Sequence, residues 1–335
     1  MTRAAQRVLA VIAALGGVAL FAYAVRRAGV DEIVDGIRRI GWGLLPILGL
    51  AGIRFLLRAA AWRQCMPPGM RVSFGRVFSA FLSGDAVGNL TPLGMAASEP
   101  TKALLVRHRL ETSDSVSSLA IDNLVYAASI AVVVISGLVV LLMTAPLPRE
   151  GREAVVVSVI AIVVGGAVML RVLRGTWSTG GASSEGARRP RWREWLSGVR
   201  RSIVAFWSAS PDRIARTFLL DMAFHVLAVY EIYLTLGWLL GGHPTIAQAL
   251  VFEGLNRVIT AAFKFVPFRV GIDEALTGAL APMLAVQPVA GVTLALVRKV
   301  RNLAWTGVGL LLIAAAPARV APASDRPGSE PLRPT

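Results

Sequence analysis

Most of this chain consists of apolar segments long enough to cross a lipid bilayer, which takes about 20 apolar residues in a helix. Hydrophobic residues make up 55% of the 335 residues and charged residues only 16%, whereas soluble domains are about a quarter charged. The sequence therefore predicts an all-α polytopic membrane protein. We predict about six transmembrane helices, at roughly Val8–Val25, Leu44–Trp62, Val116–Met143, Val155–Leu173, Ile214–Leu240 and Val289–Ala316.

Two further apolar segments, Val77–Val106 and Ile246–Leu284, are interrupted by prolines and by charged residues. In each, a proline is followed seven residues later by a glutamate: Pro92 and Glu99 in the first, Pro267 and Glu274 in the second. Proline breaks a helix, and matched broken segments in two halves of a membrane protein indicate a translocation site. We predict two oppositely facing re-entrant hairpins, the arrangement that an inverted repeat produces.

The distribution of positive charge predicts orientation in the membrane. The chain has 35 Lys and Arg against 20 Asp and Glu, a net charge of +15, and the basic residues cluster between the apolar spans. This pattern favours contact with anionic lipid rather than with nucleic acid. The segment Arg171–Arg213 holds nine arginines, so we expect it to be cytoplasmic. Both termini are then cytoplasmic, Gly241–Thr245 lies outside, and the protein is a multi-pass protein of the cytoplasmic membrane.

The predicted domain organisation is one transmembrane domain over residues 1–316, followed by a disordered tail over 317–335. A cytoplasmic basic loop over 174–212 includes an amphipathic helix at Pro190–Trp207, and Val30–Ile40 is predicted to be a helix lying on the membrane surface. Ala22-Tyr23-Ala24 imitates a signal-peptidase site, but the apolar run before it is long for a signal peptide. The sequence leaves open whether residues 1–24 are removed.

The candidate substrate-binding residues are polar side chains within apolar sequence, because such groups at membrane depth are costly and usually functional. They are Asn89, Glu99, Lys102, Glu253, Arg257, Arg269, Asp273, Glu274, Arg298 and Arg301. So many cations suit a phosphate or another anionic head group. The carboxylates have three open roles, which are to pair with these cations, to bind an amine, or to relay protons.

Other polar residues in the spans have simpler interpretations. Arg54 and Arg58 either join the candidate site or extend to the membrane surface. Asp122 either joins it or caps its helix, and Asp221 and His225, one helical turn apart, are expected to satisfy each other. Cys65 is the only cysteine and the three histidines are far apart, so the sequence predicts no metal site and no cofactor.

Two stretches of sequence resemble a known family. GMAASEPTKALLVR at 94–107 and PFRVGIDEAL at 267–276 are similar to the two hairpins of the lysylphosphatidylglycerol synthase transmembrane family, a flippase-like family. The resemblance runs from Val8 to Ala316. It implies a lipid-translocating membrane domain, and it makes Glu99, Glu274, Arg298 and Arg301 candidate head-group residues. The two glutamates need counter-ions at membrane depth, and we expect Arg298 and Arg301, the nearest cations that match the family, to supply them. At the second hairpin, Phe268-Arg269-Val270 replaces the family's glycine-rich turn.

The leading hypothesis is a flippase-like transporter for an anionic lipid or a lipid-linked intermediate, and not an enzyme. The alternatives are a membrane-embedded lipid-modifying enzyme and an accessory scaffold for one. The sequence lacks HExxH, Gly-x-Ser-x-Gly and P-loop motifs. The soluble aminoacyl-transfer domain of the full-length synthases is expected to be absent after Ala316. Neither the lipid, the direction of transport, the coupling ion nor the oligomeric state follows from the sequence.

Overall fold

The computed structural model describes residues 31, 38, 40–69, 72–91, 94–107, 112–174, 203–207, 209–263, 266–269 and 271–315. Their main helical elements are η1 Gly41–Gly43, α3 Leu44–Cys65, α4 Phe74–Leu90, α5 Met95–Val106, α6 Thr112–Thr144, α7 Arg149–Arg174, α9 Pro211–Leu240, α10 Ile246–Ala262, η2 Pro267–Arg269, α11 Ile272–Leu280, η3 Ala281–Leu284 and α12 Pro288–Ala315. Several predictions lie largely or wholly outside the described residues, namely the span at 8–25, the surface helix at 30–40, the helix at 190–207 and the tail at 317–335.

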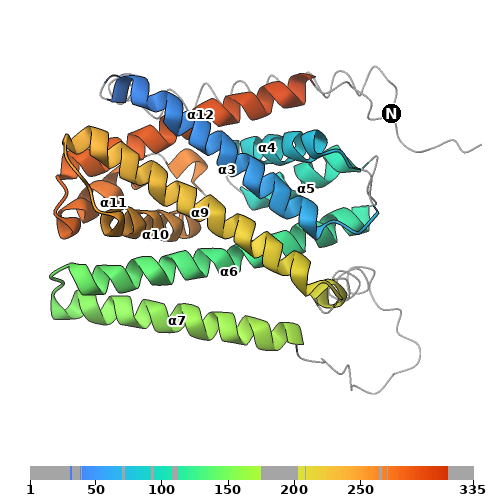
Figure 1. The fold of residues 1–335 in the computed structure, drawn as a ribbon, viewed down its shortest axis with the longest axis horizontal. Helices are drawn as coiled ribbons and strands as arrows, with labels where there is room; N and C mark the ends of the chain where they lie inside the picture. The colour runs from blue at the N-terminus through green and yellow to red at the C-terminus, as the bar shows by residue number, and fades with distance from the viewer. Residues whose placement is uncertain are drawn as a thin grey trace, which may run out of the picture.

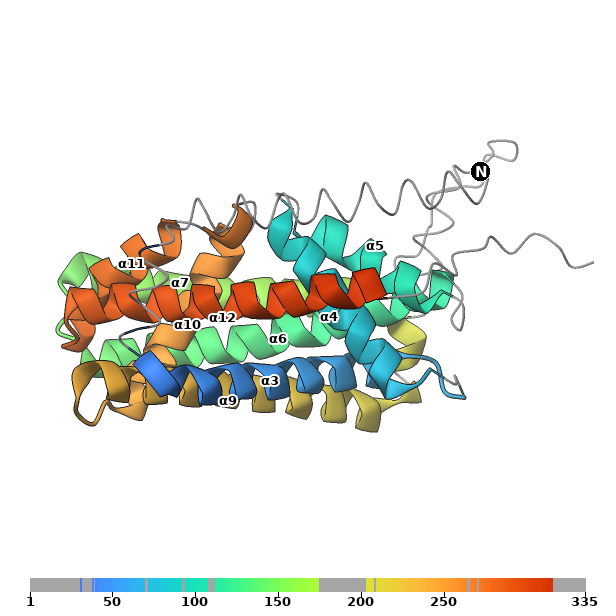
Figure 2. The same cartoon turned by 90° about the horizontal axis from the view of Figure 1, so that it is seen from above.

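Five long helices, α3, α6, α7, α9 and α12, lie side by side along the long axis of the molecule (Figure 1). Within the described residues, four helical stretches are long and apolar enough to cross a membrane: Gly41–Cys65, Ser113–Thr144, Arg149–Arg171 and Pro211–Leu240. The predicted last span corresponds to α12, which follows the same axis (Figure 2). It carries three cations, Arg298, Lys299 and Arg301, within about one helical turn near its middle. The prediction of an all-α polytopic membrane protein is confirmed.

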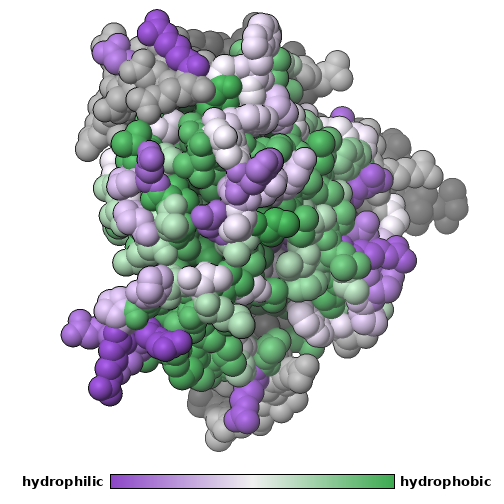
Figure 3. All heavy atoms as spheres, turned by 60° about the vertical axis from the view of Figure 1, so that its left-hand side comes forward, coloured by the Kyte–Doolittle hydropathy of each residue, from purple (hydrophilic) through white to green (hydrophobic). Residues whose placement is uncertain are grey.

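One side of the bundle is largely apolar (Figure 3). Hydrophobic residues cover much of the side seen in Figure 3, with hydrophilic residues in scattered groups between them. Helix α7 lies against α6 (Figure 1) and exposes side chains such as Val157, Ile160 and Val164. Water would not stabilise such a face, whereas lipid tails would, so the exposed positions of α7 follow from its role as a membrane span.

The first predicted hairpin is formed by α4 and α5, which pack against each other at one end of the bundle (Figure 2). Gly94 begins α5 with a φ of 32°, a backbone conformation that glycine adopts at little cost. Close packing of the two helices requires a second glycine. A Cβ on Gly84 would lie 2.4 Å from Cγ of Lys102 and 2.9 Å from the carbonyl oxygen of Ser98.

The second hairpin, formed by α10, η2 and α11, lies at the opposite end of the bundle (Figure 2). Helix α10 begins at a capping box, in which the Thr245 hydroxyl accepts from the Gln248 amide and the Gln248 side chain accepts from the Thr245 amide. At the turn, Phe268 and Arg269 have φ values of 51° and 47°, which non-glycine residues rarely adopt. The turn is therefore left-handed although neither of these residues is a glycine.

The packing pattern is that of an inverted repeat, because several helix contacts in one half have counterparts in the other. Helix α4 packs on α12 as α10 packs on α6, and α3–α4 and α5–α6 correspond to α9–α10 and α11–α12. Close glycine contacts recur as well. A Cβ on Gly309 would meet the carbonyl oxygen of Leu82, and one on Gly137 would lie 3.4 Å from Cα of Gly254. Leu82 and Gly254, like Gly137 and Gly309, are 172 residues apart in sequence.

The sidedness of the loops gives the first testable prediction. A Cβ on Gly43 would touch the Trp238 ring, so the start of α3 and the end of α9 lie at the same end of the bundle. Cysteines introduced at Trp42 and Gly242 in a Cys65→Ser background should therefore react with an impermeant thiol reagent from the same side of the membrane. A cysteine at Pro68, beyond the other end of α3, should react only from the opposite side. Labelling of all three from one side would contradict this topology.

A candidate functional site of buried ion pairs

The first part of the candidate site is a tie among three helices, centred on Arg58 of α3. Its guanidinium donates to Asp122 of α6 at 2.8 and 3.3 Å and to Asp221 of α9 at 2.5 Å, and it lies 3.9 Å from the ring centroid of Tyr126. All three charged residues are buried. In a medium of low dielectric constant, an unpaired charge costs several kcal/mol, roughly, so these pairs fix the relative positions of α3, α6 and α9.

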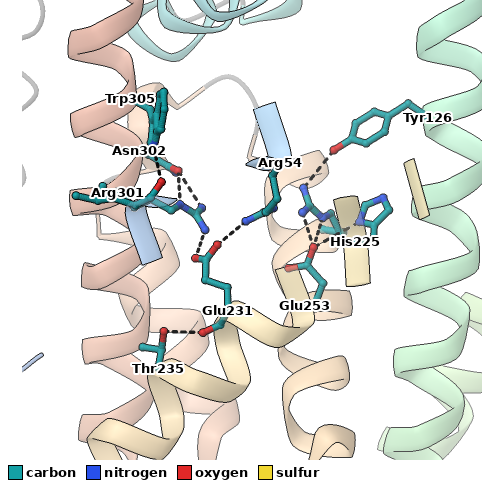
Figure 4. A network of polar contacts seen from close by, with 11 residues as sticks. Arg54, Tyr126, His225, Glu231, Thr235, Glu253, Arg301, Asn302 and Trp305 are labelled. Atoms are coloured by element: carbon teal, nitrogen blue, oxygen red, sulfur yellow. Dashed lines mark hydrogen bonds and ion pairs between the residues drawn. The ribbon is translucent and has the colours of Figure 1, made fainter. Parts of the chain in front are cut away.

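A second ion-pair group is buried near the middle of the bundle, between α3, α9 and α12 (Figure 4). Glu231 of α9 accepts from Arg54 of α3 at 2.7 Å and from Arg301 of α12. The other nitrogens of Arg301 donate to Asn302 at 2.9 and 3.2 Å. One carboxylate thus holds two guanidinium groups that come from helices far apart in sequence.

The third group lies between α6, α9 and α10 (Figure 4). Arg257 donates to Glu253, one turn earlier on α10, with an Nε–Oε1 distance of 2.7 Å, and to the hydroxyl of Tyr126 at 3.3 Å. His225 of α9 places its Nδ1 3.5 Å from the same Glu253 oxygen. Glu253 is 1% exposed, so its charge is balanced entirely by protein groups.

Arg298 of α12 differs from every other buried arginine described. It is 7% exposed but forms no hydrogen bond or ion pair with any described residue, and its Nη2 is buried without a partner. Its electrostatic neighbours include Glu253, Arg301 and Asp273. We call Arg54, Glu231, Glu253, Arg257, Arg298 and Arg301 the central cluster. With four arginines against two glutamates, the central cluster carries two positive charges in excess.

The structure distributes the other predicted site residues over the two hairpins. In the first, Asn89 donates to Asp85 at 3.1 Å and to Thr306 of α12 at 3.3 Å, and Lys102 pairs with Glu99 at 3.0 Å. In the second, Arg269 pairs with Asp273 at 2.9 Å. Each hairpin therefore holds an ion pair between two of its own residues.

Glu274 does not have the partner expected from the sequence. The family-matched cations Arg298 and Arg301 were the expected counter-ions for the hairpin glutamates, but Glu274 pairs with Lys299 and accepts from the Gly271 amide at 2.9 Å. The helical period of α12 explains the difference. Lys299 follows Arg298 by one residue and so faces about 100° away from it, which directs Lys299 to α11 and Arg298 to the central cluster.

Three more interpretations from sequence are corrected or decided. Asp221 and His225 do not satisfy each other, because Asp221 pairs with Arg58 while His225 contacts Ser129 and Glu253. Arg54 and Arg58 do not extend to the membrane surface, since both are buried in ion pairs.

Asp122 is not a helix cap either. It lies ten residues into α6 and pairs with Arg58. Glu231 is the site residue that sequence reasoning missed. The sequence did contain a signal, because Glu231 is a carboxylate in the middle of the apolar span Ile214–Leu240. A carboxylate at that depth is costly in lipid and usually has a function.

Long apolar helices around a core of ion pairs define this molecule as a polytopic α-helical membrane protein with a polar interior. A sequence model of the family described as Lysylphosphatidylglycerol synthase TM region matches residues 8–310. The chain belongs to this family. Comparisons with curated proteins and with solved structures gave no match.

Arg58 provides the second testable prediction. Arg58→Met leaves Asp122 and Asp221 buried without a cation, so we expect a loss of about 3–5 kcal/mol in the free energy of unfolding. The measurement is the unfolding of purified protein in mixed micelles with increasing denaturing detergent. The matched control is Arg216→Met, because Arg216 is exposed and its pair with Asp212 is 3.6 Å long, which should contribute at most about 1 kcal/mol.

Restoring neutrality should recover part of this stability. Adding Asp122→Asn and Asp221→Asn to Arg58→Met removes both uncompensated charges, and well-packed neutral replacements of a buried ion pair are often tolerated. If Arg58→Met were as stable as the Arg216→Met control, the three-helix tie would not hold the fold together.

Proposed function

We propose that this protein is a transporter that moves an anionic lipid or lipid-linked intermediate across the cytoplasmic membrane, and that it is not an enzyme. The observation that carries the proposal is the buried, unpaired guanidinium of Arg298. A buried cation without a counter-ion is unfavourable, and a bound anion would relieve that cost. Structural arginines in the same core are paired, which supports a binding role for Arg298 rather than a structural one.

The chemistry of the central cluster suits a phosphate group. Guanidinium groups bind phosphate oxygens with two parallel hydrogen bonds, and the excess of two positive charges matches the charge of one phosphomonoester or the sum of two phosphodiesters. A neutral lipid head group would leave that excess uncompensated. We therefore propose membrane lipids with an anionic head group as the partners, with no nucleic acid involved.

The two hairpins support a path across the membrane. Irregular backbone at membrane depth is tolerated only where it is buried in protein or lines a polar path. In transporters, broken helices that enter from opposite ends form such a path. η2 of the second hairpin contacts α4 of the first, so the two hairpins meet within the bundle. We propose that head groups reach the central cluster past Lys102 and Glu99 on one side and past Arg269 and Asp273 on the other.

The arginine-rich segment supports a proposed orientation of this path in the membrane. We propose that the ends of α3 and α7 and the start of α9 face the cytoplasm, because Arg171–Arg213 is rich in arginine. The two termini are then cytoplasmic, and the Gly241–Thr245 connection is external. The hairpin of α4 and α5 is accordingly open to the cytoplasm, and that of α10 and α11 to the outside.

Arg298 gives the third testable prediction. A charge-assisted hydrogen bond contributes about 1.5–3 kcal/mol, so Arg298→Gln should slow the movement of fluorescently labelled phosphatidylglycerol in proteoliposomes by roughly ten- to a hundredfold. Transbilayer movement is measured as protection of the label from a membrane-impermeant quencher. Arg149→Gln is the matched control, because Arg149 is exposed and pairs only with Glu153, and it should leave the rate unchanged.

The stability of the variant separates binding from folding. Arg298 forms no ion pair with a described residue, so its replacement leaves no carboxylate without a cation. Arg298→Gln should therefore be at least as stable as the wild type in the unfolding assay. Arg301→Gln, by contrast, removes one of the two cations at Glu231 and should be less stable. A fully active Arg298→Gln variant, or one that fails to fold, would contradict the proposal.

A further inference from the structure

His225 is a buried imidazole that the proposed transport path does not use. It is 1% exposed, and its ring stacks on that of Tyr126 at a centroid distance of 5.6 Å and an interplanar angle of 5°. Its Nε2 lies 3.2 Å from the hydroxyl of Ser129 on α6, and its Nδ1 lies 3.5 Å from Oε1 of Glu253 on α10. The ring therefore bridges two helices through both of its nitrogens.

The hydrogen bonds around His225 leave room for one more proton. Ser129 donates its hydroxyl proton to the carbonyl oxygen of Tyr126 at 2.8 Å, so it can only accept from Nε2 of His225. A neutral imidazole with its proton on Nε2 has a bare lone pair on Nδ1. That lone pair faces the Glu253 carboxylate, and Nδ1 is buried without a hydrogen-bond partner. A proton on Nδ1 would turn this unfavourable contact into an ion pair.

We propose that His225 and Glu253 form a proton-binding site, and that the proton bound at Nδ1 of His225 is the coupling ion for the anion held by the central cluster. The coupling half of this inference rests on the proposed function; the proton site does not. One proton enters from water and adds to Nδ1, and His225 becomes an imidazolium that donates to Ser129 through Nε2 and to Glu253 through Nδ1. No other bond is made or broken.

The charged groups around the site explain why proton and anion would bind together. Arg257 on α10 shares the Glu253 oxygen with His225, while Arg54 on α3 and Arg298 on α12 also act on Glu253. Tyr126 on α6 contributes a hydroxyl to Arg257. On the histidine's own helix, α9, Asp221 and Glu231 are occupied by Arg58, Arg54 and Arg301.

Protonation thus adds a third positive charge to the two already in excess. An anion at Arg298 offsets this charge, so each ligand favours binding of the other, as linkage requires. The imidazolium also competes with Arg257 for Oε1 of Glu253. An N–H group of Arg257 is then free to donate to the anion. Proton uptake would in this way make Arg257 available to the anion in addition to Arg298, which is already unpaired.

The proton site can be tested without any lipid substrate. The chain has three histidines, so full-length protein carrying His108→Gln and His243→Gln and labelled with ¹⁵N-histidine shows His225 alone by NMR in nanodiscs. At high pH we expect a single ring proton, on Nε2. As the pH falls through the range of about 8 to 5, Nδ1 should gain a proton. Glu253→Gln keeps the shape but removes the charge, and should abolish that second proton over the same range.

Two NMR results would overturn the proton site. One is a neutral His225 whose proton is on Nδ1, because Ser129 would then be the donor and the Glu253 contact already satisfied. The other is a His225 that stays neutral across the whole range in folded protein.

Transport in proteoliposomes tests the coupling separately, with fluorescently labelled phosphatidylglycerol as the probe and an imposed pH gradient. The wild type should move the probe faster with the gradient than without it, and His225→Gln should reduce that ratio to one, whereas His243→Gln should keep it. A gradient-independent wild type would overturn the coupling. A wild type that never moves the probe would instead count against the proposed function, and the NMR result would still decide the proton site.

Discussion

The cost of an unpaired charge in a medium of low dielectric constant shapes this whole molecule. Arg58 holds α3, α6 and α9 together through Asp122 and Asp221, and Glu231 connects α9 to α3 and α12 through two arginines. Between lipid-facing helices there is little hydrophobic driving force, so ion pairs that cannot be satisfied elsewhere specify which helices are neighbours. The same constraint makes the single unpaired guanidinium among the described buried arginines, that of Arg298, informative about a ligand.

The two halves of the inverted repeat pack their helices in the same way but carry different side chains at corresponding positions. The glycine contacts of α6 with α10 and of α12 with α4 recur at a constant spacing of 172 residues. At that spacing, the position of Tyr126 on α6 corresponds to that of Arg298 on α12. One half thus places an aromatic ring under Arg58, where the other half places a cation with no partner. The two halves therefore provide unlike side chains at corresponding positions, and the unpaired cation, Arg298, lies in the second half.

Much of the fold was predictable because it depends on local patterns. The apolar spans and the two broken hairpins follow from hydropathy, proline and glycine along the chain, and the prediction that the hairpins face opposite ways came from the positive charge between the spans. The sequence also predicts a polar interior that contains Glu253, Arg257 and Arg298, because a charged side chain exposed to lipid is costly. Partner assignment was not predictable. Asp221 and His225 are one turn apart on α9, yet their partners come from α3, α6 and α10, and Glu231 was overlooked among its apolar neighbours.

The sequence by itself determined that the chain is a polytopic α-helical membrane protein with interrupted, charged segments, because apolar length and helix breakers act within a few turns of one helix. Only the tertiary structure decided which charges neutralise one another. Helix rotation sends Lys299 to Glu274 and leaves its neighbour Arg298 unpaired, and the approach of α6, α9 and α10 places both nitrogens of His225 against polar groups. Such pairings depend on distances between residues far apart in the chain, which the order of residues does not encode locally.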